Sequence, residues 1–312
     1  MSSPILFALA ALIWGSTFWA ITLQLGEVAP AVSVVYRFGI ASAVLFAWCY
    51  ARGDKLRLPW PAMRWVLAQG FFSFALSYVC TYNAELFLVS ALVAVLFALT
   101  VFWNPICSRI AFGTPITWRT WAAGMVAVCG VIMLFFHSIA GAWAQIAGGG
   151  TGGFLLGLAL ALTATISSAC GNVVVSKVRE QCSNLLLTLA YSMLCGTLMV
   201  ALFVLATGQQ FTLPSSPRYW AGMLYLAVFG SVIAFAAFFT LINRIGAQKA
   251  VYIGVLTPVI SVLLSIQLEG YRPGLLEFAG MAVCLASVAW AVRNPSSTPK
   301  PALNLTTVAE VP

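Results

Sequence analysis

The sequence predicts an all-α integral membrane protein whose ten transmembrane helices form two inverted repeats of five helices each. Three observations support this fold class. Hydrophobic residues make up 62% of the 312 residues and charged residues only 7%, whereas soluble domains carry roughly a quarter charged residues. The apolar residues gather in runs of about 20, the length that crosses a bilayer core of about 30 Å. In addition, several short patterns of the first half recur in the second half.

Short segments rich in glycine, proline and charge separate the apolar runs, as at Arg52–Lys55 and Gly208–Pro217. Because lipid offers the backbone no hydrogen-bond partners, runs of this length are expected to be α-helices. The expected spans are residues 4–24, 30–50, 64–83, 86–108, 118–136, 153–175, 184–206, 218–240, 249–268 and 275–292. Residues 293–312 are polar and rich in proline, which predicts a disordered cytoplasmic tail.

The distribution of lysine and arginine predicts the orientation of the helices, because cytoplasmic loops carry an excess of basic residues. With ten spans and a cytoplasmic N-terminus, Arg218 and Arg272 fall in outer loops, and Arg37 falls within a span. The remaining twelve of the 15 basic residues all lie on the cytoplasmic side: Arg52, Lys55, Arg57, Arg64, Arg109, Arg119, Lys177, Arg179, Arg244, Lys249, Arg293 and Lys300. We therefore expect both termini in the cytoplasm.

Four pairs of patterns recur at offsets of about 155 to 157 residues, which indicates two halves of similar structure. The pairs are Ala123–Cys129 with Ala279–Cys284, Tyr36 with Tyr191, Trp65 with Trp220, and Thr100 with Thr257. We expect the first repeat at residues 1–145 and the second at residues 146–292. Because five is an odd number, the second half crosses the membrane in the opposite direction to the first. Inverted repeats place a binding site at their interface near the midplane, so this architecture favours transport.

Other classes of function lack their usual signals. The basic residues are scattered rather than gathered in a stripe, so no nucleic acid partner is expected. The eight cysteines show no CxxC pair and no metal-ligand spacing, so we expect no metal and no cofactor. The sequence has no HExxH, GxSxG or P-loop motif and a single histidine, His137, so we do not expect an enzyme. An integral-membrane enzyme is kept as the alternative from a different class.

Five short motifs follow one another in an order that is typical of one transporter family. They are Trp14–Phe18, Tyr36–Phe38 after Pro30, Asn83–Glu85, Val89–Ala94, and Gly124–Gly130. Over residues 4–292 the sequence resembles the ten-helix EamA-type branch of the drug/metabolite transporter superfamily. Within that branch it is similar to the bacterial exporters of aromatic amino acids. It departs from the family in the fourth span, which has Thr100-Val101 where a proline is common and carries Pro105 instead.

The resemblance implies a multi-pass protein of the bacterial inner membrane that exports small molecules by alternating access. Its partners would be a small-molecule substrate, such as an amino acid or a related metabolite, and the lipid bilayer. We expect it to act as a monomer. A carrier of phosphorylated sugars or nucleotide sugars has the same fold and is the alternative within transport. Phosphate recognition needs several basic side chains that converge, whereas Arg37 is the one basic residue expected away from the ends of the spans.

Aromatic and polar side chains in the middle of the spans are candidates for lining a central cavity. Tyr78 and Tyr82 lie four residues apart and so share one face of the third span. The full set of candidates is Trp14, Thr17, Tyr78, Tyr82, Trp103, Asn104, Ser168, Asn172, Tyr252 and Thr257. Such a cavity suits an amphipathic solute, including aromatic amino acids. Hydrogen bonding between helices is the alternative role for each hydroxyl.

Charged residues and prolines within the spans suggest gating and hinge roles. Arg37 is a candidate contact for a substrate carboxylate or an outer gate, or a structural partner of Glu27 or Glu85. No other charge is expected inside a span, and Glu85 is expected at the outer boundary. Without a buried carboxylate to carry protons, we expect facilitative or loosely coupled transport. Pro105 and Pro258 are candidate hinges, because a proline within a helix frees a carbonyl and permits bending.

Overall fold

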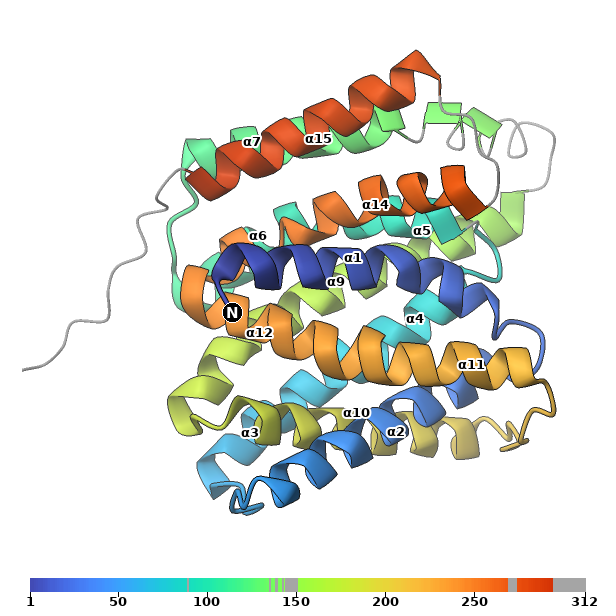
Figure 1. Ribbon diagram of the computed structural model, residues 1–312, viewed down its shortest axis with the longest axis vertical. Helices are drawn as coiled ribbons and strands as arrows, with labels where there is room; N and C mark the ends of the chain where they lie inside the picture. Colours follow the sequence, from blue (N-terminus) through green and yellow to red (C-terminus); the bar gives the residue numbers. More distant parts are fainter. Residues whose placement is uncertain are drawn as a thin grey trace, which may run out of the picture.

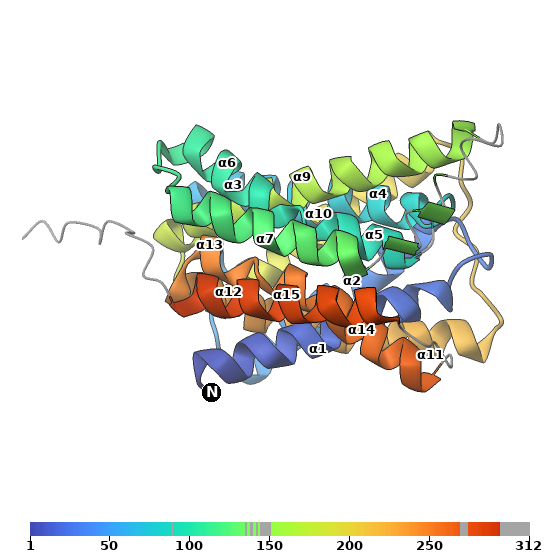
Figure 2. The same cartoon turned by 90° about the horizontal axis from the view of Figure 1, so that it is seen from above.

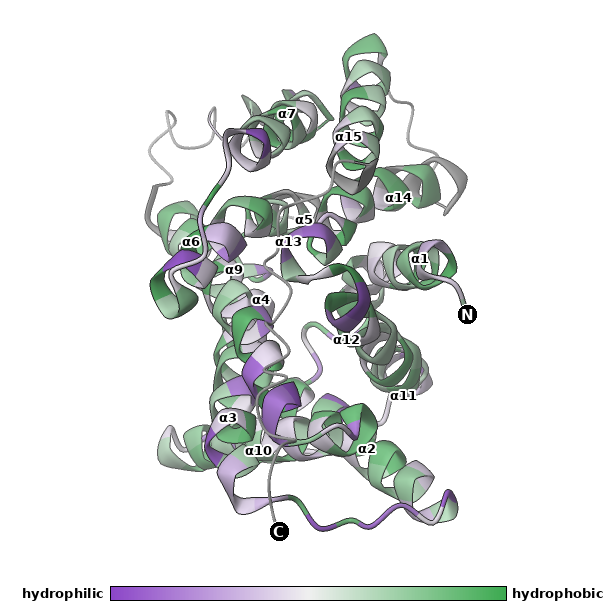
Figure 3. Ribbon diagram, turned by 90° about the vertical axis from the view of Figure 1, so that its left-hand side faces the viewer, coloured by the Kyte–Doolittle hydropathy of each residue, from purple (hydrophilic) through white to green (hydrophobic). Residues whose placement is uncertain are grey.

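A computed structural model describes residues 1–293 except 89, 135, 138, 139, 142, 144–150 and 269–273. The predicted boundary between the repeats at residues 145 and 146 lies outside the described residues, as does the predicted tail after residue 293. Within the described part of the chain, all regular structure is helical. Hydrophobic residues cover most of the helices, and hydrophilic residues gather in the connecting segments (Figure 3).

The first half contains five spans, two of which are interrupted. The first, second and fifth spans are the single helices α1 (Ser3–Thr22), α2 (Pro30–Ala51) and α7 (Trp118–Leu134). The third span consists of α3 (Trp60–Gln69), the π-helical segment η1 (Gly70–Leu76) and α4 (Ser77–Ala84). The fourth span consists of α5 (Ser90–Phe97) and α6 (Thr100–Phe112). Proline in the first turn of α1, α2 and α3 fits the start of a helix, because these positions need no backbone N–H donor.

The second half repeats this order. Its sixth, seventh and tenth spans are the single helices α9 (Thr151–Gln181), α10 (Leu185–Ala206) and α15 (Leu275–Arg293). The eighth span consists of α11 (Pro217–Tyr225), the π-helical segment η2 (Leu226–Ile233) and α12 (Ala234–Ile245). The ninth span consists of the short α13 (Ala247–Ala250) and α14 (Ile253–Leu268). Five continuous helical stretches are long and apolar enough to cross a membrane: Ser3–Thr22, Pro30–Ala51, Gly153–Gln181, Leu185–Ala206 and Pro217–Ile245.

The main contacts between helices are symmetric: a contact that a helix of the first half makes has a counterpart made by the equivalent helix of the second half. Helix α2 packs against α10, and α7 packs against α15; Figure 2 shows the latter two side by side on one face of the bundle. Helix α1 packs against α12 and α14, and its counterpart α9 packs against α4 and α6. Helix α1 and helix α9 start at opposite ends of the bundle (Figure 1). The predicted fold class, ten helices in two inverted repeats, is confirmed.

Glycines let the paired helices approach closely. A Cβ atom on Gly70 would lie 2.7 Å from the carbonyl oxygen of Ser192, and one on Gly196 would lie 2.9 Å from the carbonyl oxygen of Gly70. At the contact of α7 with α15, a Cβ on Gly280 would lie 2.5 Å from the backbone nitrogen of Leu134. Small residues at these positions allow backbone-to-backbone packing, the usual way for helices to associate in lipid.

The fourth and ninth spans are both interrupted, the fourth near its middle and the ninth near its start. The fourth is interrupted at Ala98-Leu99 and the ninth at Val251-Tyr252, so each break precedes its proline, Pro105 or Pro258, by six or seven residues. Both the breaks and the prolines are 153 residues apart. Asn104-Pro105 is therefore the counterpart of Thr257-Pro258, which corrects the predicted match of Thr100 with Thr257.

Hydrogen bonds at one end of the bundle join the start of the chain to the ends of two later helices. The side chain of Arg244 donates a hydrogen bond of 2.7 Å to the carbonyl oxygen of Met1, and that of Arg179 donates one of 2.9 Å to the carbonyl oxygen of Asn243. The C-terminal ends of α9 and α12 therefore lie beside the start of the chain. We call this the near end, and the opposite end, where α1 and α4 finish, the far end (Figure 1).

Candidate functional site

A central cavity of about 110 Å³ lies between the two halves of the bundle. Helices α1, α2, α4, α6, α9, α12 and α14 all contribute to its wall, as do η1 and the last residue of α5. The breaks of the fourth and ninth spans meet beside it, because a Cβ on Gly254 would lie 3.4 Å from Thr100 Oγ1. Breaks in the helices therefore place backbone and hydroxyl groups, rather than only apolar side chains, at the middle of the bundle.

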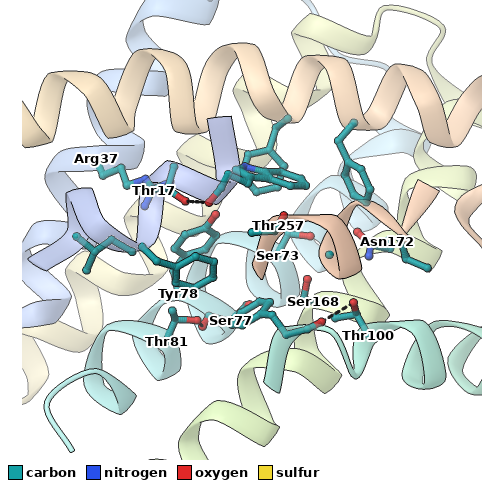
Figure 4. Close-up of a pocket in the computed structure, with 18 residues that line it drawn as sticks. Thr17, Arg37, Ser73, Ser77, Tyr78, Thr81, Thr100, Ser168, Asn172 and Thr257 are labelled. Carbon is teal, nitrogen blue, oxygen red and sulfur yellow. Dashed lines mark hydrogen bonds between the residues drawn. The ribbon is translucent and has the colours of Figure 1, made fainter. Parts of the chain in front are cut away.

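The structure brings together seven of the residues that the sequence indicates. Six of the predicted cavity residues line the wall, and Arg37 joins them: Trp14, Thr17, Tyr78, Ser168, Asn172 and Thr257. Figure 4 shows Arg37 at one end of the cavity and Asn172 at the other, with Tyr78 and Thr257 between them.

Four of the predicted cavity residues lie elsewhere. Tyr82 is fully buried beyond the far end of the cavity, one helical turn past Tyr78. Trp103 and Asn104 follow Thr100 in α6, where the helix has already left the cavity. Neither the indole nitrogen of Trp103 nor the amide of Asn104 forms a hydrogen bond within the described part of the chain. Tyr252 lies in the break before α14, and its buried hydroxyl likewise has no hydrogen-bond partner among the residues that the structure describes. The structure therefore does not place these four residues on the wall of this cavity.

One wall of the cavity is aromatic. The indole ring of Trp14 meets Phe235 and Phe238 edge to face, with ring centroids 5.1 and 5.0 Å apart. Its N–H donates a hydrogen bond of 3.1 Å to the carbonyl oxygen of Gly230 in η2. Because the indole is fixed both by its ring contacts and by this hydrogen bond, it offers a rigid apolar surface to a solute.

The polar side chains that line the cavity fall into two groups. The hydroxyls of the first group donate to carbonyl oxygens three or four residues earlier in the chain: Thr17 to Trp14, Thr81 to Ser77, Thr100 to Phe97 and Thr257 to Ile253, over 2.7 to 2.9 Å. The second group makes no hydrogen bond to any described residue: the hydroxyls of Ser73, Tyr78 and Ser168 and the amide of Asn172. These four side chains are therefore free to bind a solute or water.

Arg37 supplies the positive charge of the cavity, and its side chain is held on three sides. Its Nε donates to Ser231 Oγ over 2.9 Å and its Nη1 to the hydroxyl of Tyr82 over 3.3 Å. The guanidinium carbon lies 4.9 Å from the centroid of the Tyr78 ring. Arginine stays protonated at any accessible pH. The second terminal nitrogen, Nη2, makes no hydrogen bond to a described residue, so one donor group is free.

The expected ion pair of Arg37 with Glu27 or Glu85 is absent from the described residues. Arg37 is instead bound by hydroxyl groups. Two of the carboxylates expected at the outer boundary are buried among the helices. Glu85 caps the end of α4 with 7% exposure, and Glu277 lies in the first turn of α15 with 2% exposure. Glu277 pairs with Nδ1 of His137, whereas neither oxygen of the Glu85 carboxyl accepts a hydrogen bond from a described residue.

The sequence matches the family model of EamA-like transporters twice, over residues 1–136 and 155–293. The chain belongs to the EamA-like transporter family. Its two matches cover the two halves seen in the structure, and they agree with the resemblance that the motifs suggest. As an EamA-like protein, the chain is a membrane transporter rather than an enzyme. No group of three His, Cys, Asp or Glu side chains that could hold a metal ion occurs in the described part of the chain.

Two relatives that are named as transporters match this EamA-like chain over most of their length. The uncharacterised inner membrane transporter YedA of Escherichia coli K12 is 28% identical and covers 91% of this chain and 89% of its own. The S-adenosylmethionine/S-adenosylhomocysteine transporter of Chlamydia trachomatis is 23% identical, and the match covers 89% of this chain and 86% of that transporter. A crystal structure with 20% identity and a TM-score of 0.70 covers 93% of this chain and 96% of its own, which shows a shared fold.

Sequence reasoning missed the second-half aromatic residues of the EamA-like cavity. Phe235 and Phe238 lie three residues apart in the eighth span, and this spacing is the signal that could have identified them. Nothing in the sequence indicates the π-helical segments η1 and η2. In these segments the backbone takes one extra residue per turn, which changes the face that the following residues present.

Proposed function

We propose that this EamA-like transporter moves small amphipathic solutes that carry a carboxylate, with amino acids, including aromatic ones, as the best match. The observation that carries the proposal is the arrangement of the cavity: one buried arginine at one end, a free amide at the other, and an aromatic wall between them (Figure 4). Movement by alternating access follows from the inverted repeats, which can rock about a site that they share.

The arginine end suits a carboxylate. Arg37 keeps Nη2 free, and the hydroxyl of Tyr78 is a second free donor beside it. A carboxylate that accepts both donors would make charge-assisted hydrogen bonds, which are roughly twice as strong as neutral ones. A phosphate group would need more positive charge than the single guanidinium that the cavity wall offers. The geometry therefore disfavours phosphorylated sugars and nucleotide sugars as substrates.

The rest of the cavity suits an amino group and an apolar side chain. The Asn172 amide and the Ser168 hydroxyl are free acceptors for an ammonium group. The Gly254 carbonyl loses its helical donor, because Pro258 has no N–H four residues later. Trp14 and the two phenylalanines of α12 then offer the surface against which a side chain packs.

The volume of the cavity favours a small solute. A buried water needs roughly 10–15 Å³ of comparable space, so 110 Å³ holds on the order of ten water-sized groups. This is about the size of an aromatic amino acid. S-adenosylmethionine, for which the Chlamydia trachomatis relative is named, carries the same amino-acid head group on a much larger body. It would share the arginine end but needs a wider cavity.

We further propose export across the bacterial inner membrane, with both termini in the cytoplasm, so that the near end faces the cytoplasm and the far end the periplasm. The excess of basic residues on one side supports this orientation. Within the described residues the cavity wall contains no carboxylate, so net transport follows the solute's own gradient. Bending at the breaks before Pro105 and Pro258 would let the halves move.

Counterflow in proteoliposomes tests this function. Vesicles with purified protein and a high internal concentration of unlabelled L-phenylalanine should take up a trace of labelled L-phenylalanine. External phenethylamine, which lacks the carboxylate, should compete at least about tenfold less well than L-phenylalanine, as expected for the loss of a charge-assisted contact. Equal competition by phenethylamine, or uptake no greater than in protein-free vesicles, would contradict the proposal. S-adenosylmethionine as a third competitor distinguishes a wider cavity from the one described.

A further inference from the structure

Glu85 carries a buried carboxyl group that does not line the cavity. It follows the last residue of α4 and is 7% exposed. Both side-chain oxygens are buried, and neither accepts a hydrogen bond from any described residue. Arg37 is the cation with which it interacts electrostatically. The hydrogen bonds of the Arg37 side chain, however, go to Ser231 and Tyr82 and not to Glu85.

The surroundings of Glu85 do not stabilise a negative charge. An ionised carboxylate that is buried without donors is costly. Its place at the C-terminal end of a helix adds the partial negative charge of the last carbonyl groups. Around it, α2 contributes Arg37 and α4 contributes the neutral phenols Tyr78 and Tyr82; η1 and the adjacent first half of α9 contain no ionisable side chain. Tyr219 of α11 and the exposed Glu27 lie further out.

The residues beside Glu85 close the far end of the cavity. The Tyr82 hydroxyl donates to Gln24 Oε1 over 3.1 Å and accepts from Arg37, which also donates to Ser231. This chain of hydrogen bonds, which we call the far-end cluster, joins the segment after α1 to α2, α4 and η2. Each of its four members is at most 1% exposed. Because Arg37 lines the cavity and the whole cluster is buried, a route out of the cavity past Arg37 would require these bonds to break.

We propose that Glu85 is a proton-binding site that operates this closure: it carries a proton while the far-end cluster is intact and releases it when the far end opens. In the closed state the carboxyl is neutral and Arg37 is bound by hydroxyls. On opening, the O–H bond of Glu85 breaks, the proton passes to water at the far end, and the electron pair stays on the carboxylate. Arg37 then leaves Tyr82 and pairs with the ionised Glu85, which holds the cluster apart.

The proposal goes beyond the choice of solute, because it concerns the closure and holds for any solute. Since Glu85 lies at the far end, it exchanges its proton with that side in both directions. The proton therefore controls the rate of opening without being carried across, and transport stays facilitative. A low pH at the far end favours the closed state, and a high pH favours opening.

Infrared spectroscopy tests the proton site without any solute. The protein at neutral pH should show the carbonyl-stretch band of a protonated carboxylic acid, shifted in deuterium oxide. The band should be absent from Glu85→Gln and present in Glu27→Gln, a control in which an exposed glutamate is changed. A wild-type spectrum without the band, or a Glu85→Gln spectrum that keeps it, overturns the proposal.

Exchange of L-phenylalanine tests the closure, at equal pH on both sides of the vesicle. The wild-type exchange rate should rise by up to about tenfold per pH unit as Glu85 loses its proton, and Glu27→Gln should behave alike. Glu85→Gln should exchange slowly at every pH. Tyr82→Phe should shift the wild-type pH profile to lower pH, because Arg37 loses an acceptor. A wild-type exchange rate that does not depend on pH, or that depends on sodium concentration instead, overturns the proposed role of Glu85 in the closure. If the infrared band is present but no L-phenylalanine is exchanged, only the proposed substrate is contradicted.

Discussion

The indole N–H of Trp14, in the first span, donates a hydrogen bond of 3.1 Å to the carbonyl oxygen of Gly230, in the eighth span. Gly230 lies in the π-helical segment η2, where the backbone departs from the α-helical pattern. A Cβ on Gly230 would lie 2.9 Å from the methyl group of Thr17, so glycine lets α1 approach η2 this closely. The contact joins the two halves directly beside the cavity.

Replacing Trp14 with phenylalanine should weaken this junction. The variant keeps an aromatic ring but leaves the Gly230 carbonyl without its donor, which costs about 1 to 3 kcal/mol for a buried group. We expect a lower apparent melting temperature in detergent and weaker competition by aromatic solutes. The matched control is Trp60→Phe at a site with 84% exposure, which should change neither. Equal melting of Trp14→Phe and wild type would contradict the account.

The contact between the third and seventh spans should not tolerate a single methyl group. In Gly196→Ala the new Cβ would lie 2.7 Å from the Cβ of Phe74, so the helices must separate; overpacking of this kind costs about 1 to 3 kcal/mol. In the control, Gly39→Ala, the nearest atom is 3.7 Å away, an ordinary contact. Thermal unfolding followed by tryptophan fluorescence should show a drop for Gly196→Ala alone. A similar midpoint for both variants would show that the helices can part at no cost.

The two tyrosines of α4 should have separate roles. Tyr78 lines the cavity and has a free hydroxyl, whereas Tyr82 lies in the far-end cluster. Tyr78→Ala should lower the transport of aromatic amino acids more than that of small aliphatic ones. Tyr82→Phe should change the rates for all solutes by a similar factor. Rates for a set of labelled amino acids, each divided by protein level, distinguish the two; a uniform loss in Tyr78→Ala would show that this residue only packs.

Reporter fusions test the orientation of the spans. Fusions at residues 55, 115, 180, 246 and 300 should report the cytoplasm, and those at 145 and 212 the periplasm, because the basic residues gather on the first side. An alkaline phosphatase reporter is active only in the periplasm and a fluorescent protein only in the cytoplasm, so each site is read twice. A periplasmic signal at residue 300 would overturn the ten-span orientation.

The sequence predicts the helices well because lipid imposes one length and one kind of backbone hydrogen bonding on every span. The limits of α2 are predicted to within one residue. The sequence does not show where a span is interrupted: Pro105 and Pro258 mark the fourth and ninth spans, but the breaks come earlier. The interruption explains the errors at the site, since it places Thr100 on the cavity and leaves Asn104 outside it.

Burial of single side chains could not be predicted at the ends of spans. Glu85 is one residue past the end of α4, and the sequence gives no sign that neighbouring helices cover it. Tyr78 and Tyr82 share a helix face, as predicted, but the cavity ends between them. Such outcomes depend on the lengths of neighbouring helices, which a single segment of sequence does not contain.

The most direct test of the central claim is to fill the cavity. Ser168 lines it, and Ile166, two residues earlier on α9, faces outward with 38% exposure. Both are changed to tryptophan, and counterflow of labelled L-phenylalanine is measured at equal amounts of monodisperse protein. We expect Ser168→Trp to lose nearly all counterflow and Ile166→Trp to keep most of it. Transport by Ser168→Trp at the wild-type rate would show that the solute does not pass through this cavity.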